Sequence, residues 1–275
     1  ASYVAPDLTY SFSPISWFGP ATTTGTLHAL QWRATGVTNP IANAYTGYGS
    51  KANVTILNGA PLANQDVALI AVTTANLDGS VTVPSGYALV NKSLGVKFAD
   101  GASIRLFTDL TAAAAFNYLT PSLPGATMTV GANASSPTAG STTTTLSNVA
   151  SNATGVSVAL QEAPVLSLPV NAATGIGYSQ NFSWTAFPGG IHVVAISGPG
   201  GQPRFIVFTS GTSTTIPDLT SAGLPLPSTT GYTWVVLGIA PLGSVDALAG
   251  QTSLLPTGGT AYVAQSVSRT FTTAP

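Results

Sequence analysis

The chain has 275 residues, 44% of them apolar, but only 5% carry a charged side chain and the net charge is −1. An average soluble domain has roughly 25% charged residues, so uncharged polar side chains must cover most of this surface. The seven Lys and Arg residues are spread along the sequence and cannot form the basic patch that phosphates require, which excludes a nucleic-acid partner.

The first predicted strand covers residues 7–13, where Leu8, Tyr10 and Phe12 alternate with Thr and Ser. Such alternation places the three apolar side chains on one face of a strand. A strand at a free chain end can add to the sheet edge of a neighbouring copy, where backbone hydrogen bonds provide affinity and these side chains provide register. Pairing within its own domain is the alternative.

The chain begins at Ala1 without a signal-peptide pattern, so we expect the mature form of an exported protein, located outside the cell or on its surface.

Short alternating runs bounded by Gly, Pro, Asn or Asp continue through the first half and predict further strands. They cover residues 28–34, 53–59, 66–74, 79–83, 87–90, 103–107, 126–130 and 155–161. Residues 108–119 contain four consecutive Ala and predict a helix of about two turns that Pro121 ends. The Thr-rich residues 134–155 predict an exposed hairpin-like excursion, with a flexible linker as the alternative.

Several residues are candidates for binding or modification by sugars. Tyr45 and Tyr48 lie in a Gly-rich run that we expect to be a loop, where exposed rings can stack on glycans, although most such tyrosines simply lie on a surface. Sequons for N-linked glycosylation occur along the chain, at Asn53, Asn91, Asn133, Asn152 and Asn181. O-linked sugar on the Thr-rich run is a further alternative.

From Pro164 onward the predicted strands become regular. They cover residues 165–169, 180–186, 191–197, 204–210, 213–217, 232–240 and 266–273, with a small helix at 244–249 capped by Ser244. Seven strands in this length suit an immunoglobulin-like sandwich. We therefore expect an all-β chain of two immunoglobulin-like β-sandwich domains in tandem, residues 1–162, with the Thr-rich excursion, and residues 163–275.

The start of the sixth of these strands carries a Tyr, as in sandwiches with a tyrosine corner. We expect the hydroxyl of Tyr232 to bond to the backbone near residues 226–229, which would satisfy a buried polar atom. With Trp184 and Trp234 nearby in the predicted core, the segment 163–275 resembles a fibronectin type III domain of bacterial secreted or surface proteins. This resemblance implies a spacer or interaction role without catalytic residues. Residues 79–90 and 98–107 are similar to transthyretin-like or carboxypeptidase-regulatory sandwiches.

Side chains able to carry chemistry are few. There is no Cys, and Asp78 and Asp100 each precede a Gly, which indicates turns rather than calcium sites. His28 and His192 lie in predicted strands without a ligand at metal spacing, so each is expected to be a packed strand residue. No nucleophile elbow, phosphate loop or zinc-protease motif occurs. We expect no enzymatic activity, no metal and no cofactor.

No apolar stretch is long enough for a transmembrane helix, because 20 Pro and 29 Gly interrupt every candidate. A surface with so little charge offers little repulsion between copies. The sequence therefore predicts an extracellular structural protein that assembles with itself into a filament or coat, with surface glycans as possible further partners. The alternative is a monomeric glycan-binding or adhesion module of the cell surface.

Overall fold

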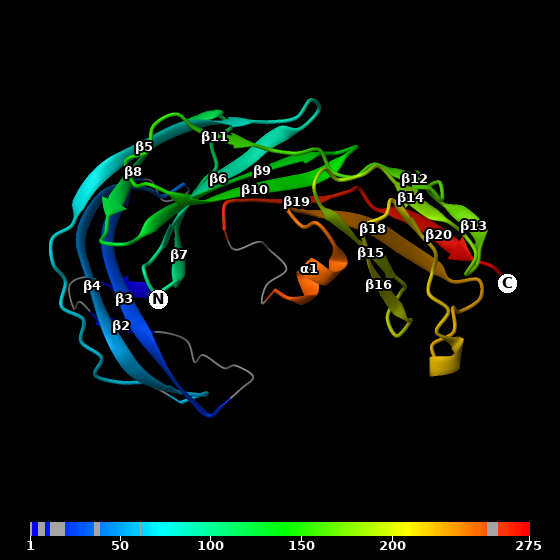
Figure 1. The fold of residues 1–275 in the computed structure, drawn as a ribbon, viewed down its shortest axis with the longest axis horizontal. Helices are drawn as coiled ribbons and strands as arrows, with labels where there is room; N and C mark the ends of the chain where they lie inside the picture. Colours follow the sequence, from blue (N-terminus) through cyan, green and yellow to red (C-terminus); the bar gives the residue numbers. More distant parts are fainter. Residues whose placement is uncertain (1, 5–8, 12–19, 36–38, 61, 252–257) are drawn as a thin grey trace.

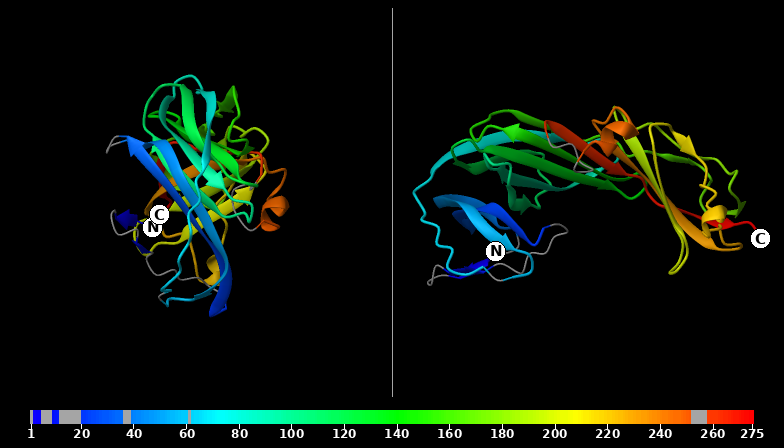
Figure 2. Two further views of the ribbon diagram at one scale, coloured as in Figure 1. Left: turned by 90° about the vertical axis from the view of Figure 1, so that its left-hand side faces the viewer. Right: turned by 60° about the horizontal axis from the view of Figure 1, so that its bottom comes forward.

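The computed structural model describes residues 2–4, 9–11, 20–35, 39–60, 62–251 and 258–275. Nearly all regular structure in these residues is β-strand, so the predicted all-β class is confirmed. No helix in them is long and apolar enough to cross a membrane. The molecule is an elongated arch, with the N-terminal strands under one end and the C-terminus at the other (Figures 1 and 2).

The elements of the first part of the chain are β1 Ser2–Val4, β2 Thr9–Ser11, β3 Thr22–Thr35, β4 Ile41–Leu57, β5 Thr73–Thr82, β6 Ala88–Lys97, β7 Ser103–Asp109, β8 Ala115–Ser122, β9 Thr127–Ser136, β10 Gly140–Val149 and β11 Val156–Ala159. Those of the second part are β12 Leu166–Leu168, β13 Ala173–Ile176, β14 Phe182–Trp184, β15 Ile191–Ser197, β16 Arg204–Thr209, β17 Ser213–Thr214, η1 Thr220–Ala222, β18 Gly231–Ala240, α1 Val245–Ala249, β19 Thr260–Gln265 and β20 Arg269–Thr273.

One ten-stranded sheet runs through both parts of the molecule. Its main order is β13-β20-β18-β19-β10-β9-β6-β7, and β15 and β16 join it through β18. Strand β19 pairs with β10 of the first part along one edge and with β18 of the second part along the other. The division of the chain into two domains at residues 162 and 163 stays a prediction, because the backbone ladder is continuous across the two parts.

Two smaller sheets cover this large sheet, one in each part. The sheet β11-β5-β8 packs on the β7-β6-β9-β10 end, and the core between them includes Leu77, Leu94, Val130 and Phe116. In the second part, the β12-β14-β17 sheet is separate from the large sheet, and the core there includes Phe182 and Trp234. Each part therefore has an apolar core of its own, which is the arrangement expected of sandwiches.

The long strands β3 and β4 form a separate hairpin that curves down at the left of Figure 1. Residues 43–50, which the sequence predicted as a Gly-rich loop, belong to β4. Residues 66–74 are mostly extended coil rather than the predicted strand, and Ile70 exchanges two backbone hydrogen bonds with Tyr48. This coil lies so close to Gly49 that a Cβ atom there would be 2.1 Å from the Ala68 carbonyl oxygen. Because Gly49 has no Cβ atom, the coil can pack directly against β4.

Two other predictions for the first part are corrected. Residues 108–119 form no helix: they contain the end of β7, a short loop and the start of β8, because pairing of β8 with β5 outweighs the helix propensity of four alanines. The Thr-rich residues do form a hairpin, β9–β10, but it lies within the large sheet, and Thr144 is fully buried. The predicted helix near 244–249 is confirmed as α1, and the Ser244 Oγ accepts a hydrogen bond from the Ala247 N–H.

Candidate functional site

Three polar side chains meet where the β3–β4 hairpin reaches the sandwich. The Nδ1 atom of His28 lies 2.9 Å from the Tyr48 hydroxyl, and its Nε2 atom lies 2.9 Å from an Asp100 carboxylate oxygen. The His28 ring also stacks on Phe98 with ring centroids 3.9 Å apart. The sequence placed His28 in a packed strand, Asp100 in a turn and Tyr48 in a loop, and it gave no sign that these residues come together across 72 positions.

This cluster lines a shallow pocket of about 370 Å³. Ser50 and Thr26 add hydroxyl groups to its wall. Hydrogen bonds from His28 and from the Ala102 N–H lower the pKa of Asp100, so its carboxylate stays ionised and holds the His28 ring in place. The pocket offers donors and acceptors beside an aromatic edge, which is suited to a small polar ligand.

The predicted stacking platform of Tyr45 and Tyr48 is not present as proposed. Tyr45 is 4% exposed and packs in the core of the first part, and burial raises the pKa of its hydroxyl. Its ring is therefore closed to a sugar. Tyr48 is half-buried and its hydroxyl is bonded to His28, so it can contribute a polar group to the pocket.

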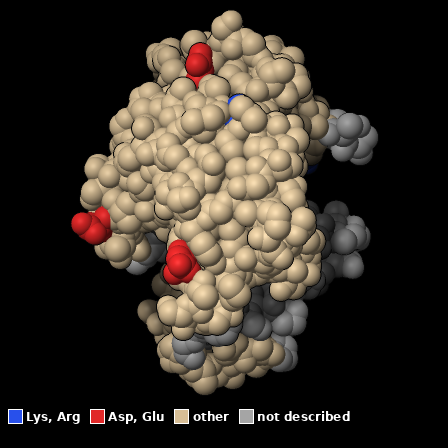
Figure 3. Space-filling view, turned by 90° about the vertical axis from the view of Figure 1, so that its right-hand side faces the viewer, with Lys and Arg blue, Asp and Glu red and all other residues tan. Residues whose placement is uncertain are grey.

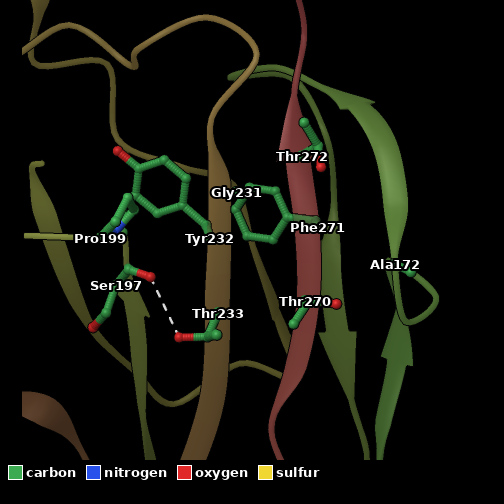
Figure 4. A pocket seen from close by; sticks show the side chains of 10 residues that line it. Ala172, Ser197, Pro199, Gly231, Tyr232, Thr233, Thr270, Phe271 and Thr272 are labelled. Carbon is green, nitrogen blue, oxygen red and sulfur yellow. Dashed lines mark hydrogen bonds between the residues drawn. The ribbon is translucent and has the colours of Figure 1, made fainter.

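A second pocket, of about 440 Å³, lies where β18 and β20 meet the end of β15. The rings of Tyr232 and Phe271 stack 5.6 Å apart at its floor, and both residues are buried (Figure 4). Thr233 donates a hydrogen bond to the Ser197 carbonyl oxygen beside them, at 3.3 Å (Figure 4). Apart from the Tyr232 hydroxyl, the polar groups of the described residues that line this pocket are Ser and Thr hydroxyls and backbone groups.

The prediction that the Tyr232 hydroxyl bonds to the backbone near residues 226–229 is wrong. The Tyr232 hydroxyl is buried and has no hydrogen-bond partner among the described residues, as is also true of the indole N–H groups of Trp184 and Trp234. The Leu226 N–H instead donates to the hydroxyl of Tyr178, and both residues are packed against the core of the second part. Tyr232, Trp184 and Trp234 are therefore core residues that fill volume.

A buried ionic cluster in the first part escaped the sequence reasoning. The Lys92 ammonium, fully buried on β6, lies 3.1 Å from a carboxylate oxygen of Asp109, the last residue of β7. Lys92 also donates to the backbone oxygens of Thr111 and Ala113, each at 2.8 Å. The alternation of residues 88–97 places Lys92 on the same face as Leu94, and this position was a signal that could have revealed a buried cation.

Both oxygens of the Asp109 carboxylate accept hydrogen bonds. Burial alone raises its pKa, but hydrogen bonds from the Thr111 N–H, from the Tyr118 hydroxyl at 2.7 Å and from Lys92 outweigh burial and hold the pKa well below its usual range. The Asn39 amide donates to the Oδ1 atom of Asp109 at 3.4 Å, whereas Lys92 and the Tyr118 hydroxyl contact the Oδ2 atom. Asp109 is therefore ionised at neutral pH.

His192 is a second buried titratable group. It is 1% exposed, and its Nε2 atom accepts a hydrogen bond from the Phe187 N–H at 2.9 Å. The Nε2 atom therefore carries no proton. Burial lowers the pKa of His192 below the ordinary value of 6.5. Its role is structural, as the sequence predicted for a packed strand histidine.

The His192 site predicts an acid-sensitive stability. Because the folded-state pKa is lower than the unfolded-state pKa, the contribution of His192 is fully present above about pH 6.5 and is lost as the pH falls towards the folded-state value. We expect the free energy of unfolding to fall between about pH 7 and pH 5, and to fall less in His192→Gln, whose amide oxygen can accept the same bond. Urea unfolding at several pH values measures this. An unchanged pH dependence in His192→Gln, with His28→Gln as the control, would contradict the assignment.

The predicted glycosylation sites differ in accessibility. Asn53, Asn152 and Asn181 are exposed, whereas Asn91 is half-buried. Asn133 is also half-buried, and its amide donates to the Thr142 carbonyl oxygen. A sugar on Asn133 would replace one hydrogen of an amide that donates to both Thr142 and Thr143, so the three exposed residues are the better candidates.

The predicted strand-donation residues are only partly described. Leu8 and Phe12 lie outside the described residues, and Tyr10 is in β2, opposite Tyr3 of β1. Within the described part of the chain, β1 and β2 pair with each other and join none of the other sheets. The predicted single N-terminal strand is thus replaced by a short hairpin.

Strand β16 is a free edge of the large sheet. Among the described residues it pairs with β15 alone, and its apolar side chains Ile206 and Phe208 are 48% and 40% exposed. An apolar strand with unpaired backbone groups is a template for another strand. On the face drawn in Figure 3, charged side chains are few and far apart, so this face offers little electrostatic repulsion to another copy.

The turn predicted from the sequence is present at Asp100 but not at Asp78. Asp100 lies in the predicted turn, whereas Asp78 lies within β5 and accepts a hydrogen bond from the Gly155 N–H. Asp218 accepts from the Thr220 N–H at the start of η1. The described residues contain no group of three or more His, Asp or Glu side chains placed to hold a metal ion.

The sequence matches no protein-family model and no curated protein. The fibronectin type III and transthyretin-like resemblances therefore stay predictions.

Proposed function

We propose that this chain is the subunit of an extracellular filament or coat, in which an N-terminal strand of one copy adds to a sheet edge of the next. The observation that carries this proposal is the hairpin β1–β2, which joins none of the other sheets in the described part of the chain. An isolated two-stranded hairpin is at best marginally stable in water. A neighbouring sheet would supply the backbone partners that this segment lacks.

Strand β16 is the acceptor edge that the geometry favours. Its free backbone edge carries Ile206 and Phe208, and the contact would bury both rather than leave them exposed. The N-terminal hairpin and β16 lie in different parts of the elongated molecule (Figure 1). Contact between two different surfaces on successive copies is a heterologous contact, which forms open filaments when the rotation does not close a ring.

Electron microscopy and light scattering of the purified full chain test the proposal. We expect ordered polymers from the wild-type chain and monomers from a variant lacking residues 1–12. The double substitution Ile206→Lys/Phe208→Lys should also give monomers, because two ammonium groups on the acceptor edge oppose strand addition. Val90→Lys is the matched control, since it adds charge at an exposed residue of β6, an inner strand of the sheet.

The outcomes separate the parts of the proposal. Polymers that survive removal of residues 1–12 would show that strand donation is wrong, and polymers that survive the β16 substitutions would show that the acceptor lies elsewhere. A wild-type chain that stays monomeric at all concentrations would overturn the structural function. Monomers with measurable glycan affinity would instead favour a binding module using the pocket of His28, Tyr48 and Asp100, whose polar groups suit a sugar.

A further inference from the structure

We propose that Lys92 and Asn39 react with each other to form an intramolecular isopeptide bond, and that Asp109 transfers the protons. The bond would join the amine of β6 to the side-chain amide of the residue that precedes β4 by two positions. This reaction goes beyond the proposed assembly, since it takes place within one copy of the chain.

The same carboxylate contacts both nitrogen atoms that the reaction involves. One Asp109 oxygen lies 3.1 Å from the Lys92 Nζ atom, the nucleophile. The other accepts a hydrogen bond from the Asn39 Nδ2 atom, the leaving group, at 3.4 Å. A base in hydrogen-bond reach of both the nucleophile and the leaving group is what general acid–base catalysis requires.

The Asn39 carbonyl is also held as an electrophile. Its Oδ1 atom accepts a hydrogen bond from the Leu110 N–H at 2.9 Å. A backbone donor in this position stabilises the negative charge that develops on the oxygen when an amine attacks the carbon. The electrophile thus has an oxyanion donor at its oxygen and the base at its leaving group, and the same base contacts the lysine.

Lys92 is fully buried. The nucleophile is a neutral amine, so the reaction begins with transfer of one proton from Lys92 to Asp109. This transfer converts the ion pair into a neutral pair at the same contact.

The step balances in atoms and charge. Asp109 takes a proton from the Lys92 ammonium, and the neutral Nζ atom attacks the Asn39 Cγ atom to form a tetrahedral intermediate. Asp109 gives that proton to Nδ2, the Cγ–Nδ2 bond breaks, and the second proton released from Nζ leaves with the ammonia as ammonium. The net change is one amide formed, one amide broken and one ammonium ion released, with Asp109 again a carboxylate and no oxidant or cofactor consumed.

Such a bond would fasten the β3–β4 hairpin to the sandwich. The hairpin shares no backbone ladder with β6, β7 or β8 in the described residues. A covalent link from residue 39 to residue 92 closes the intervening chain into a loop and restricts the unfolded state, as a disulfide does in a chain that has no Cys.

The intact mass of the full-length chain, purified from a host that does not glycosylate it, tests the proposal. We expect a mass about 17 Da below that of the sequence, the mass of one ammonia, and a proteolytic fragment in which the peptides containing residues 39 and 92 are joined. The full sequence mass would overturn the proposal. A loss of about 18 Da would also overturn it, because it would indicate a bond from Lys92 to Asp109 with release of water.

Variants test the roles of the residues. Asn39→Ala and Asp109→Asn should each restore the mass expected from their sequences, whereas Lys97→Arg on the same strand should keep the loss of ammonia. Bond formation in Asp109→Asn would overturn the assignment of Asp109. If a variant fails to fold, the joined peptide of the wild-type chain still decides whether the bond exists.

Discussion

Replacement of Lys92 by Met is expected to lower the free energy of unfolding by about 3–5 kcal/mol, the usual cost of removing one partner of a buried ion pair. Lys92 is fully buried, and Met leaves the ionised Asp109 without its cation. The carbonyl oxygens of Thr111 and Ala113 would also lose the hydrogen bonds that they accept from the ammonium. The same direction is expected if Lys92 is joined to Asn39.

Urea unfolding followed by tryptophan fluorescence measures this loss. Lys97→Met is the matched control, since Lys97 lies on the same strand but is half-buried and outside the cluster, and we expect it to cost less than about 1 kcal/mol. Asn39→Ala keeps the ion pair and removes the reactive amide, so it separates the covalent contribution from the ionic one. Equal stability of Lys92→Met and Lys97→Met would show that the buried cluster contributes nothing special.

The sequence predicted the strands well where apolar and polar residues alternate. The runs around Val158, Val194 and Val236 are strands as expected. It failed where the local signal favoured another structure: the alanines after Asp109 indicated a helix, and the glycines around Tyr48 indicated a loop. In both places a distant partner strand decided the outcome, because backbone pairing and burial outweigh propensities of a few tenths of a kcal/mol per residue.

The candidate sites show the same limit more strongly. His28 and Asp100 are 72 residues apart in the sequence. Lys92 and Asn39 are 53 residues apart, and among the described residues both contact Asp109. No motif spacing encodes such contacts, since they depend on how the β3–β4 hairpin lies against the sandwich. Lys92 alone left a local trace, as a cation in the apolar register of β6. A charged residue on the buried face of a predicted strand should therefore be treated as a site whose partners are still to be found.

Replacement of Gly140 by Ala is expected to lower the free energy of unfolding by about 2–4 kcal/mol, through backbone strain and a steric clash. Gly140 opens β10 with a φ of +110°, and a Cβ atom there would lie 2.0 Å from the Gln265 carbonyl oxygen of β19. That oxygen belongs to the backbone and cannot rotate away. The substitution must therefore separate the strands where the two parts of the molecule share their sheet.

Hydrogen exchange distinguishes this local opening from a general loss of stability. Amides of β10 and β19 should exchange faster in Gly140→Ala, while those of the β5–β8 pair, which belongs to a separate sheet, keep their protection. Gly86→Ala is the control, because Gly86 also has a positive φ but nothing lies within 4 Å of its Cβ position, so only the strain is added. Unchanged exchange in β19 would contradict the clash. In a filament, tension between the N-terminal strand and β16 would cross the β10–β19 ladder, so the variant should also break under lower load if the chains polymerise as proposed.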